Sequence, residues 1–203
     1  MSTLEVNSIA PLSSSSDVTL GGSSKNIKFA SGTTVDFSTN SPTITGITQG
    51  ITEADQWRLT AFTNFNNGTN DITSNWERSD SDGAGYFGTG MTESSGIFSF
   101  PSTGYYLIIG TMSSSGQSNT GAYINMNVMT TLDNSSYDQA FRAFSASPAV
   151  DSNFTASCSF ILHVTNTTNV KLKMSSNAQY NYTVYGYTDR TVTGFTFLRI
   201  GDT

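Results

Sequence analysis

Short runs in which apolar and polar residues alternate recur along most of the chain, separated by segments rich in Gly, Asn and Ser. A period of two residues is typical of strands that bury one face, and the intervening residues are turn formers. The runs predict strands over 57–65, 96–100, 105–112, 122–129, 141–144, 155–164, 170–174, 182–187 and 192–200. Many short strands without an amphipathic helix favour an all-β sandwich. Residues 51–56 form the one helix-like segment, with Thr52 in the N-cap position.

Two of these strands differ in their patterning. In Val170–Met174 the alternation is clean, which predicts one buried face and places Lys171 and Lys173 in solvent. Residues 105–109, by contrast, are apolar at every position. A strand that is apolar on both faces needs a packing partner on each side, and in a single sandwich the second partner would be another subunit. This strand therefore indicates oligomerisation.

Residues 1–50 have a pattern of their own, in which pairs of apolar residues flank one polar residue and Gly- or Ser-rich turns follow. The pairs are Val18/Leu20, Ile27/Phe29, Val35/Phe37 and, less regularly, Ile44/Ile47. Because a three-residue strand buries too little to be stable alone, such a repeat must stack on neighbouring repeats or on other chains. We therefore expect a trimeric β-repeat shaft over 1–50, with Phe29 and Phe37 at the subunit interface, before a head domain at 51–203. A flexible linker with scattered apolar residues is the alternative.

Composition supports a β-rich protein and narrows the partner classes. The 203 residues include 61 Ser and Thr, 13 Phe and 9 Tyr, and only 12% are charged. A net charge of −6 disfavours a nucleic-acid partner, which would need a basic surface. The single cysteine, Cys158, excludes an internal disulfide framework, and its apolar neighbours predict a buried thiol. The start of the chain lacks the features of a signal peptide, and no apolar run is long enough to insert into a membrane. These features suggest a protein assembled inside a cell and released by lysis.

Two segments carry a resemblance to a known fold family. Residues 96–107 read as an aromatic strand, a Pro-x-x-Gly turn at Pro101–Gly104 and a second aromatic strand, and residues 191–200 form a final apolar strand that contains Gly194. Together they resemble the jelly-roll head of the complement-head and tumour-necrosis-factor superfamily, over about residues 55–202. The resemblance implies that the last strand runs through the middle of the domain beside a threefold axis. It also implies a homotrimer with Tyr105, Phe195 and Phe197 at the subunit interface.

The N-terminal segments carry a second resemblance. Residues 2–9 and 26–38 resemble the start and shaft of fibre-like structural proteins of tailed bacteriophages, especially those of marine hosts. This implies a non-enzymatic appendage on the surface of the virion, a short fibre or spike, that is attached to other virion proteins by its N-terminus. Its head would adhere to a host-surface glycan or protein. A capsid decoration protein or head fibre, with a stabilising or weakly adhesive role, is the alternative.

One cluster of residues is a candidate receptor site. Tyr180, Tyr182, Tyr185 and Tyr187 crowd into eight residues, and Asn181 lies among them. Aromatic faces beside amides suit a glycan, through ring stacking and hydrogen bonds. Packing of the rings in the core and at the trimer interface is the alternative. Since side chains alternate along a strand, Tyr182 would share one face with Val184, and Tyr185 and Tyr187 would lie on the other.

The remaining candidates for chemistry are few. His163 is the only histidine, and no nucleophilic serine lies in a Gly-x-Ser-x-Gly turn, so we expect a structural histidine and no enzyme. The segment Asp80-x-Asp82-Gly83 offers oxygen ligands to calcium, but the other ligands of a full calcium loop are missing. A solvated loop is the simpler interpretation, and we expect neither a metal nor a cofactor.

Overall fold

The computed structural model of the protein describes residues 50–116, 122–147 and 152–203. The described residues all belong to one compact unit, Ile47–Thr203. The shaft predicted for 1–50, with Phe29 and Phe37, therefore lies outside the described residues, apart from its last residue.

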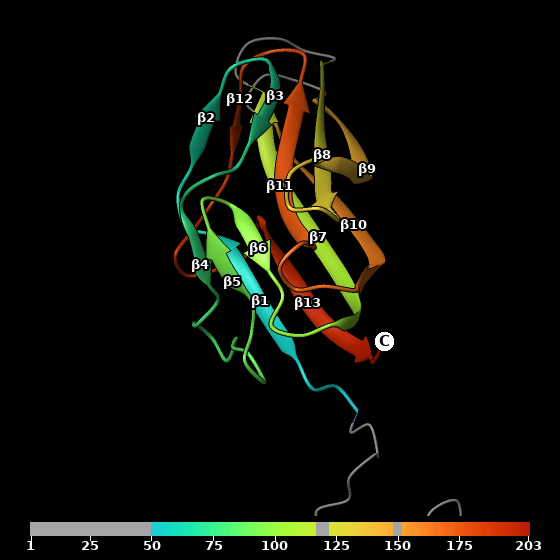
Figure 1. Cartoon of the computed structure of the whole chain (residues 1–203). Coiled ribbons are helices and arrows are strands. Elements are labelled where there is room, and N and C mark those ends of the chain that lie inside the picture. Colours follow the sequence, from blue (N-terminus) through green and yellow to red (C-terminus); the bar gives the residue numbers. More distant parts are fainter. Residues whose placement is uncertain (1–49, 117–121, 148–151) are drawn as a thin grey trace, which may run out of the picture. The chain divides into compact units, whose positions relative to one another are not determined.

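The described part of the chain is an antiparallel sandwich of two sheets, which confirms the all-β prediction (Figure 1). One sheet, here sheet A, has the order β2-β12-β7-β13-β1-β4, and β10 also pairs with β7. Sheet B has the order β5-β6-β11-β8-β9, and β3 also pairs with β11. The strands are β1 (Ala54–Leu59), β2 (Thr63–Phe65), β3 (Gly68–Asp71), β4 (Trp76–Arg78), β5 (Thr92–Ser94), β6 (Ile97–Ser99), β7 (Gly104–Gly116), β8 (Ala122–Thr131), β9 (Asp138–Ser147), β10 (Asn153–Val164), β11 (Lys171–Ala178), β12 (Tyr182–Val184) and β13 (Gly194–Gly201).

Strand β13 lies in the middle of sheet A, between β7 and β1, as the resemblance implied. Its pairing with β1 is close at Gly194, where an added Cβ would lie 2.1 Å from the carbonyl oxygen of Trp57. Only glycine fits there, because contacts under 3 Å force the backbone to move. Gly194 thus allows the final strand to enter the sheet.

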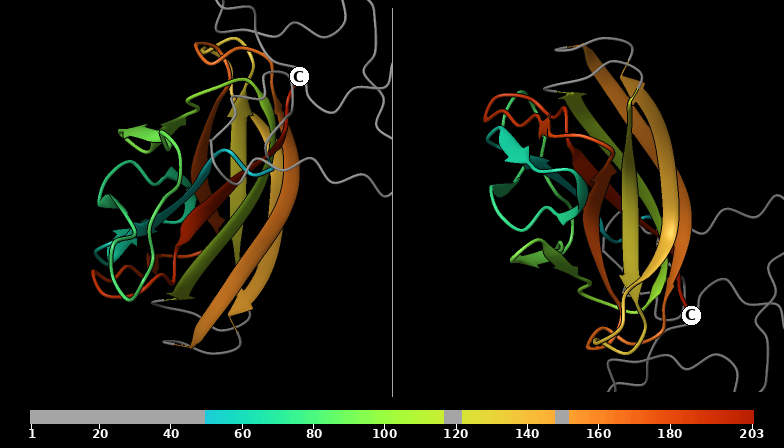
Figure 2. Two further views of the ribbon diagram at one scale, coloured as in Figure 1. Left: turned by 90° about the horizontal axis from the view of Figure 1, so that it is seen from below. Right: turned by 90° about the horizontal axis from the view of Figure 1, so that it is seen from above.

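The core lies between the two sheets and is rich in aromatic rings. Phe98 of sheet B packs edge-on against Phe195 of sheet A, with the ring centroids 5.5 Å apart, and both side chains are buried. Trp57 and Trp76 contact the same Phe98 ring at 5.5 and 5.1 Å. Edge-to-face pairs of this kind add to the stabilisation from apolar burial. In Figure 2 the long strands of the second half of the chain (yellow to red) lie together on one side of the short strands that precede them.

Three details of the sequence prediction are corrected. Residues 51–56 are not helical: Ala54–Leu59 is strand β1, which pairs with β13 and β4. The strand predicted over 57–65 is two strands, β1 and β2, separated by residues 60–62. The sequence does not predict the short strands β3, β4 and β5, because their polar sequences lack an apolar alternation. β3 and β4 form by pairing with the more distant strands β11 and β1, and β5 pairs with its neighbour β6. Among the described residues, none belongs to a helix long and apolar enough to cross a membrane.

Candidate functional site

A cleft of about 340 Å³ opens on the outer face of sheet A. It is lined by Ser113, Asn153, Phe154, Thr155, Tyr185, Tyr187 and Val192. Ser113 of β7 lies opposite Thr155 of β10, and their hydroxyl oxygens are 2.7 Å apart. The lining therefore combines three aromatic rings with hydroxyl and amide groups, and among the described residues it contains no carboxylate and no cationic side chain.

The two tyrosines are placed by backbone contacts of the segment that follows β12. The amide of Tyr185 donates to the carbonyl of Ser113 at 2.9 Å, and the amide of Tyr187 donates to the carbonyl of Leu59 at 2.8 Å. Gly186 lies between them, where an added Cβ would come within 2.6 Å of the backbone of Ala61. A glycine is thus needed for the chain to pass this point and present both rings.

The rings belong to a small exposed aromatic cluster. Phe62 packs against Tyr185 and Tyr187 with centroid distances of 4.8 and 5.1 Å, and is itself half-exposed. The hydroxyl of Tyr185 donates to Oγ of Ser115 at 2.6 Å, which fixes the ring. Arg190 lies over the Tyr187 ring at 4.8 Å and is paired with Asp189 at 2.8 Å. This arginine lowers the pKa of Asp189, so the pair remains ionised and nearly neutral overall. The cleft therefore suits a neutral, hydroxyl-rich ligand with an apolar face, such as a sugar ring.

The structure divides the five residues predicted to bind a receptor. Tyr185 and Tyr187 line the cleft. Tyr182 is fully buried and its hydroxyl is 2.5 Å from Oγ of Ser176, so its prediction as a receptor-binding residue is corrected. Tyr180 is exposed in the turn after β11, and Oδ1 of Asn181 accepts a hydrogen bond from the amide of Asn67. Neither of these two lines the cleft.

Sequence reasoning missed Phe62, Ser113, Asn153 and Thr155. Ser113 and Thr155, whose hydroxyls pair, are 42 residues apart in the sequence, and no local pattern predicts their pairing. Phe62 lies within the strand predicted over 57–65, but in the structure it lies in the break between β1 and β2. The sequence does not predict this break, so it does not show that the Phe62 ring joins the two tyrosines.

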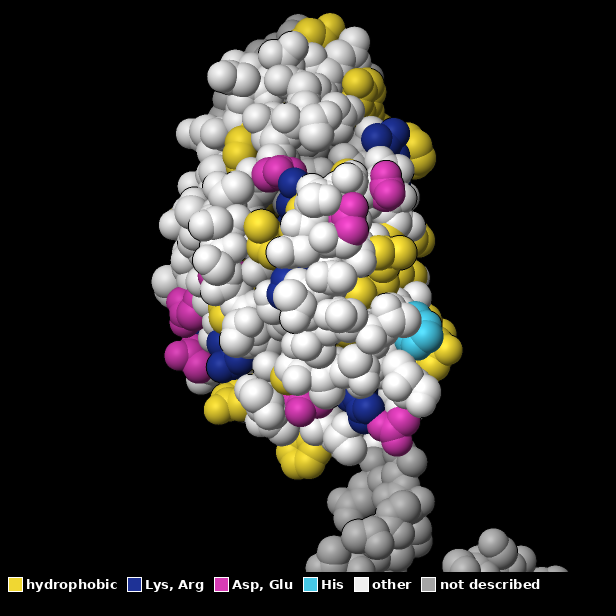
Figure 3. All heavy atoms as spheres, viewed as in Figure 1, with side chains coloured by type: hydrophobic (Ala, Val, Ile, Leu, Met, Phe, Trp, Pro, Cys, Tyr) yellow, Lys and Arg dark blue, Asp and Glu magenta, His cyan; other side chains and the backbone are white. Residues whose placement is uncertain are grey.

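The same outer face of sheet A carries an exposed apolar surface farther along β7. We define the apolar strip as Tyr105, Leu107 and Ile109 of β7, Ile161 of β10 and Leu198 of β13. In the strand register Ile161, Leu107 and Leu198 lie side by side. The single histidine, His163, stacks on Tyr105 with a centroid distance of 4.2 Å, and Figure 3 shows it (cyan) among hydrophobic side chains at one edge of the molecule. Tyr106 and Ile108, on the other face of β7, are fully buried.

The other residues predicted at the subunit interface lie elsewhere. Phe195 and Phe197 have exposed fractions of 1% and 0% within one chain, because they alternate with Thr196 and Leu198 and point into the core. Their prediction as interface residues is corrected, since a side chain buried in its own subunit has no surface left for a neighbour. Tyr105 is 40% exposed and remains available for a contact.

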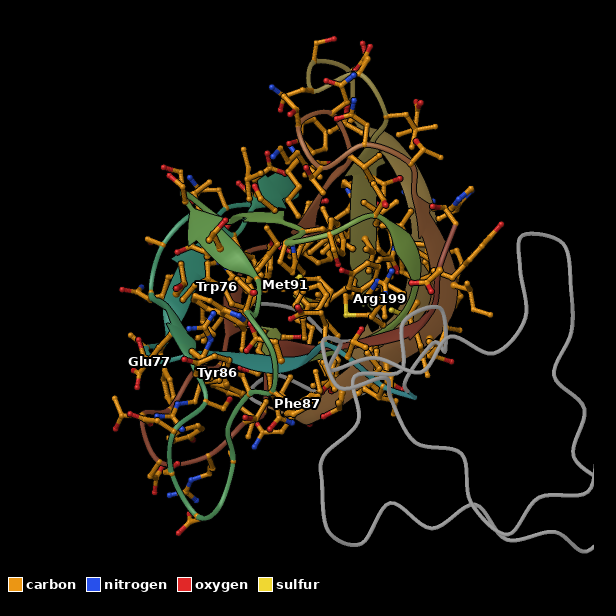
Figure 4. The ribbon with its side chains drawn as sticks, turned by 60° about the horizontal axis from the view of Figure 1, so that its bottom comes forward. Trp76, Glu77, Tyr86, Phe87, Met91 and Arg199 are labelled. Carbon is orange, nitrogen blue, oxygen red and sulfur yellow. The ribbon has the colours of Figure 1, made fainter. Side chains whose placement is uncertain are left out.

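The acidic segment considered for calcium takes part in ion pairs. Asp80 and Glu77 both accept hydrogen bonds from Nη2 of Arg58, at 2.6 and 2.8 Å, and Arg58 is almost completely buried. Figure 4 shows Glu77 at the outer margin of this region. Within the described residues, no group of three or more His, Cys, Asp or Glu side chains could hold a metal ion. Cys158 is buried, and that burial raises the pKa of its thiol.

The fold has counterparts among solved structures. The crystal structure of murine APRIL at pH 5.0 matches with a TM-score of 0.53 and 12% identity, over 73% of this chain and 98% of that one. The structure of Eiger TNF from S. frugiperda matches with a TM-score of 0.55 and 11% identity, over 76% and 96%. No protein-family model and no curated protein matches the sequence. At these identities the likeness shows the fold: the described part of the chain is a jelly roll of the TNF and C1q type.

Proposed function

We propose that the chain is a homotrimeric, non-enzymatic adhesion protein of a tailed-bacteriophage virion, whose head binds a host-surface glycan. The observation that carries the adhesive role is the cleft. Its two tyrosine rings, paired hydroxyls and an amide are the groups that bind a sugar, and none of its described lining residues carries a charge. A TNF-like fold is typically non-catalytic, which agrees with a binding role.

Trimer formation is supported by the apolar strip. Ile161 is 61% exposed and Ile109 is 40% exposed, although both lie in the middle of long strands. Contiguous apolar surface of this kind marks an interaction site more often than an isolated exposed residue does. A TNF-like fold suggests a homotrimer, and three heads on one axis would multiply a weak sugar affinity through avidity.

The virion location depends on the sequence alone. Residues 2–9 and 26–38 resemble phage fibre proteins, and we infer that the N-terminal segment attaches the head to other virion proteins. A truncated chain without residues 2–16 should then fold and trimerise but fail to join particles that lack the native protein. Recovery of full occupancy by the truncated chain would contradict this assignment.

The adhesive role is tested by the binding of the fluorescent full-length chain to a glycan array and to host cells. Tyr187→Ala removes one wall of the cleft and should reduce binding at least about tenfold, the loss expected for one stacked ring in a trivalent protein. Tyr180→Ala is the matched control, because Tyr180 is exposed outside the cleft and its loss should leave binding unchanged. Equal binding by both variants, with unchanged melting temperatures, would refute the cleft as the receptor site. A wild-type chain that binds no glycan and no cell would favour the capsid-decoration alternative.

A further inference from the structure

The outer face of sheet B carries a group of side chains that the cleft and the apolar strip do not use. Core residues of β8 alternate with Asn125 and Asn127, which therefore lie on the outer face. In the register of β8 with β9, Arg142 lies opposite Asn127 and Phe144 lies opposite Asn125. We call these four residues the β9 platform. It lies on the opposite side of the sandwich from the cleft.

Arg142 is held on the platform by an amide. Its Nε donates a 2.8 Å hydrogen bond to Oδ1 of Asn127, a side chain that is 2% exposed. The other arginines of the described residues each pair with a carboxylate: Arg58, Arg78, Arg190 and Arg199. For Arg142 no carboxylate lies within pairing distance in the described part of the chain. Its Nε is occupied while its two terminal nitrogens remain available, and these two nitrogens form the fork that binds a carboxylate through two parallel hydrogen bonds.

Phe144 supplies an apolar surface beside this cation. Its side chain is 75% exposed, although it lies within strand β9. The guanidinium carbon of Arg142 is 5.8 Å from the centroid of the Phe144 ring. Figure 3 shows a cationic side chain next to hydrophobic ones over this part of the surface, near β9. A ligand that contacts the guanidinium would therefore also reach the ring.

Asn125 adds an unsatisfied polar group to the platform. It is 3% exposed, and its Oδ1 has no hydrogen-bond partner among the described residues. Buried polar atoms are nearly always paired in native proteins, so a hydroxyl of a ligand or a water molecule is the expected partner of this oxygen.

We propose that the β9 platform is a second binding site, and that its ligand is a sugar bearing a carboxylate, of the uronic-acid type. The carboxylate would bind the terminal nitrogens of Arg142, the apolar face of the ring would lie on Phe144, and a hydroxyl would donate to Asn125. Arg142 is the one arginine of the described residues without a carboxylate partner, and a lone guanidinium on a chain with a net charge of −6 suits one carboxylate and disfavours a polyanion such as nucleic acid. This inference is independent of the cleft, whose described lining residues include no cation and suit a neutral sugar.

The test is calorimetric titration of the full-length chain with oligogalacturonate and with its methyl ester, which has the same rings without the charge. The wild-type chain should bind the acid and should bind the ester at least about tenfold more weakly. Arg142→Gln removes the charge and should weaken binding of the acid at least about tenfold, while the ester is unaffected. Arg142→Lys retains the charge but not the forked pair of nitrogens, so its affinity for the acid should lie between those of the wild type and of Arg142→Gln. Phe144→Ser should weaken binding of the acid and of the ester.

Three results would overturn the proposal. The first is a wild-type chain that does not bind the acid, or binds acid and ester equally. The second is that Arg142→Gln binds the acid as tightly as the wild type does, whereas Tyr187→Ala no longer binds it. That result would show that the acid binds in the cleft. The third is a change from trimer to monomer in Phe144→Ser, since Phe144 would then be a subunit contact. If Tyr187→Ala binds glycan as the wild type does, the cleft is not the receptor site, and the test of the β9 platform is unaffected.

Discussion

Replacement of Ile161 by Asp should separate the trimer into folded monomers. Ile161 is 61% exposed in a single chain, so the variant loses little stability within its own subunit. Full burial of an isoleucine side chain contributes about 1.5–3 kcal/mol, and the part still exposed would contribute about 1–2 kcal/mol per subunit on assembly. Three copies give about 3–6 kcal/mol, which weakens association by a factor of about 10² to 10⁴. Burial of three aspartates at the interface acts in the same direction.

The assay is sedimentation equilibrium at micromolar concentration. The wild-type chain should have three times the mass of 21.7 kDa, and Ile161→Asp should have the mass of one chain with an unchanged circular-dichroism spectrum. Leu132→Asp is the matched control, because Leu132 is 68% exposed but lies in the loop between β8 and β9 and is not part of the apolar strip. A trimeric Ile161→Asp variant, or a monomeric wild-type chain, would refute the assignment of the strip to the subunit contact.

Other substitutions test the fold and its local contacts. Phe197→Asp places a charge in the core, costs several kcal/mol and should abolish soluble protein at any oligomeric state, as measured by soluble yield. Gly186→Ala should lower stability by about 1–3 kcal/mol through its clash with Ala61, and should weaken sugar binding in the cleft; unchanged binding and melting temperature would contradict the close fit. Hydrogen bonds from the backbone amides of Ser136 and Ser135 lower the pKa of Asp133 in the folded state. The ionised carboxylate therefore contributes its full stabilisation of the folded state above the unfolded pKa of about 4, and this stabilisation is lost as the pH falls toward the folded pKa. The difference in urea unfolding between wild type and Asp133→Asn should accordingly be constant above about pH 5 and should shrink steadily as the pH falls below about 4, whereas a difference that stays the same from pH 5 to pH 2 would argue against the linkage.

The sequence predicts best the strands in which apolar and polar residues alternate, because the alternation shows which face is buried. Leu172 and Met174 in β11 are fully buried, and Lys171 and Lys173 lie on the other face, as a period of two requires. The sequence of β4, Trp76–Arg78, has no such pattern, and it becomes a strand because β1 provides hydrogen-bonding partners. Polar three-residue strands are thus decided by their neighbours, which local sequence cannot show.

The sequence predicts the candidate site only in part, as it does the strands. Crowded tyrosines point to the segment, and alternation separates the buried Tyr182 from Tyr185 and Tyr187 only when the strand position is known. The hydroxyl wall of the cleft depends on the pairing of β7 with β10, and the charge of Arg142 is conspicuous only after the partners of the other arginines are known. Both depend on contacts between distant segments.

The central position of β13 has a consequence for the biogenesis of the head. Ala54 at the start of the described fold pairs with Leu198 near its end, so β1 cannot join its main partner until residues 194–201 have left the ribosome. Contacts of such large sequence separation slow folding, and until they form, β1 and β7 each present an open strand edge. A nascent chain interrupted before residue 194 would therefore be exposed to proteases and prone to aggregate, because sheet A cannot close without β13. Strand β13 thus decides whether the sandwich forms, because only a chain translated through residue 201 can close sheet A.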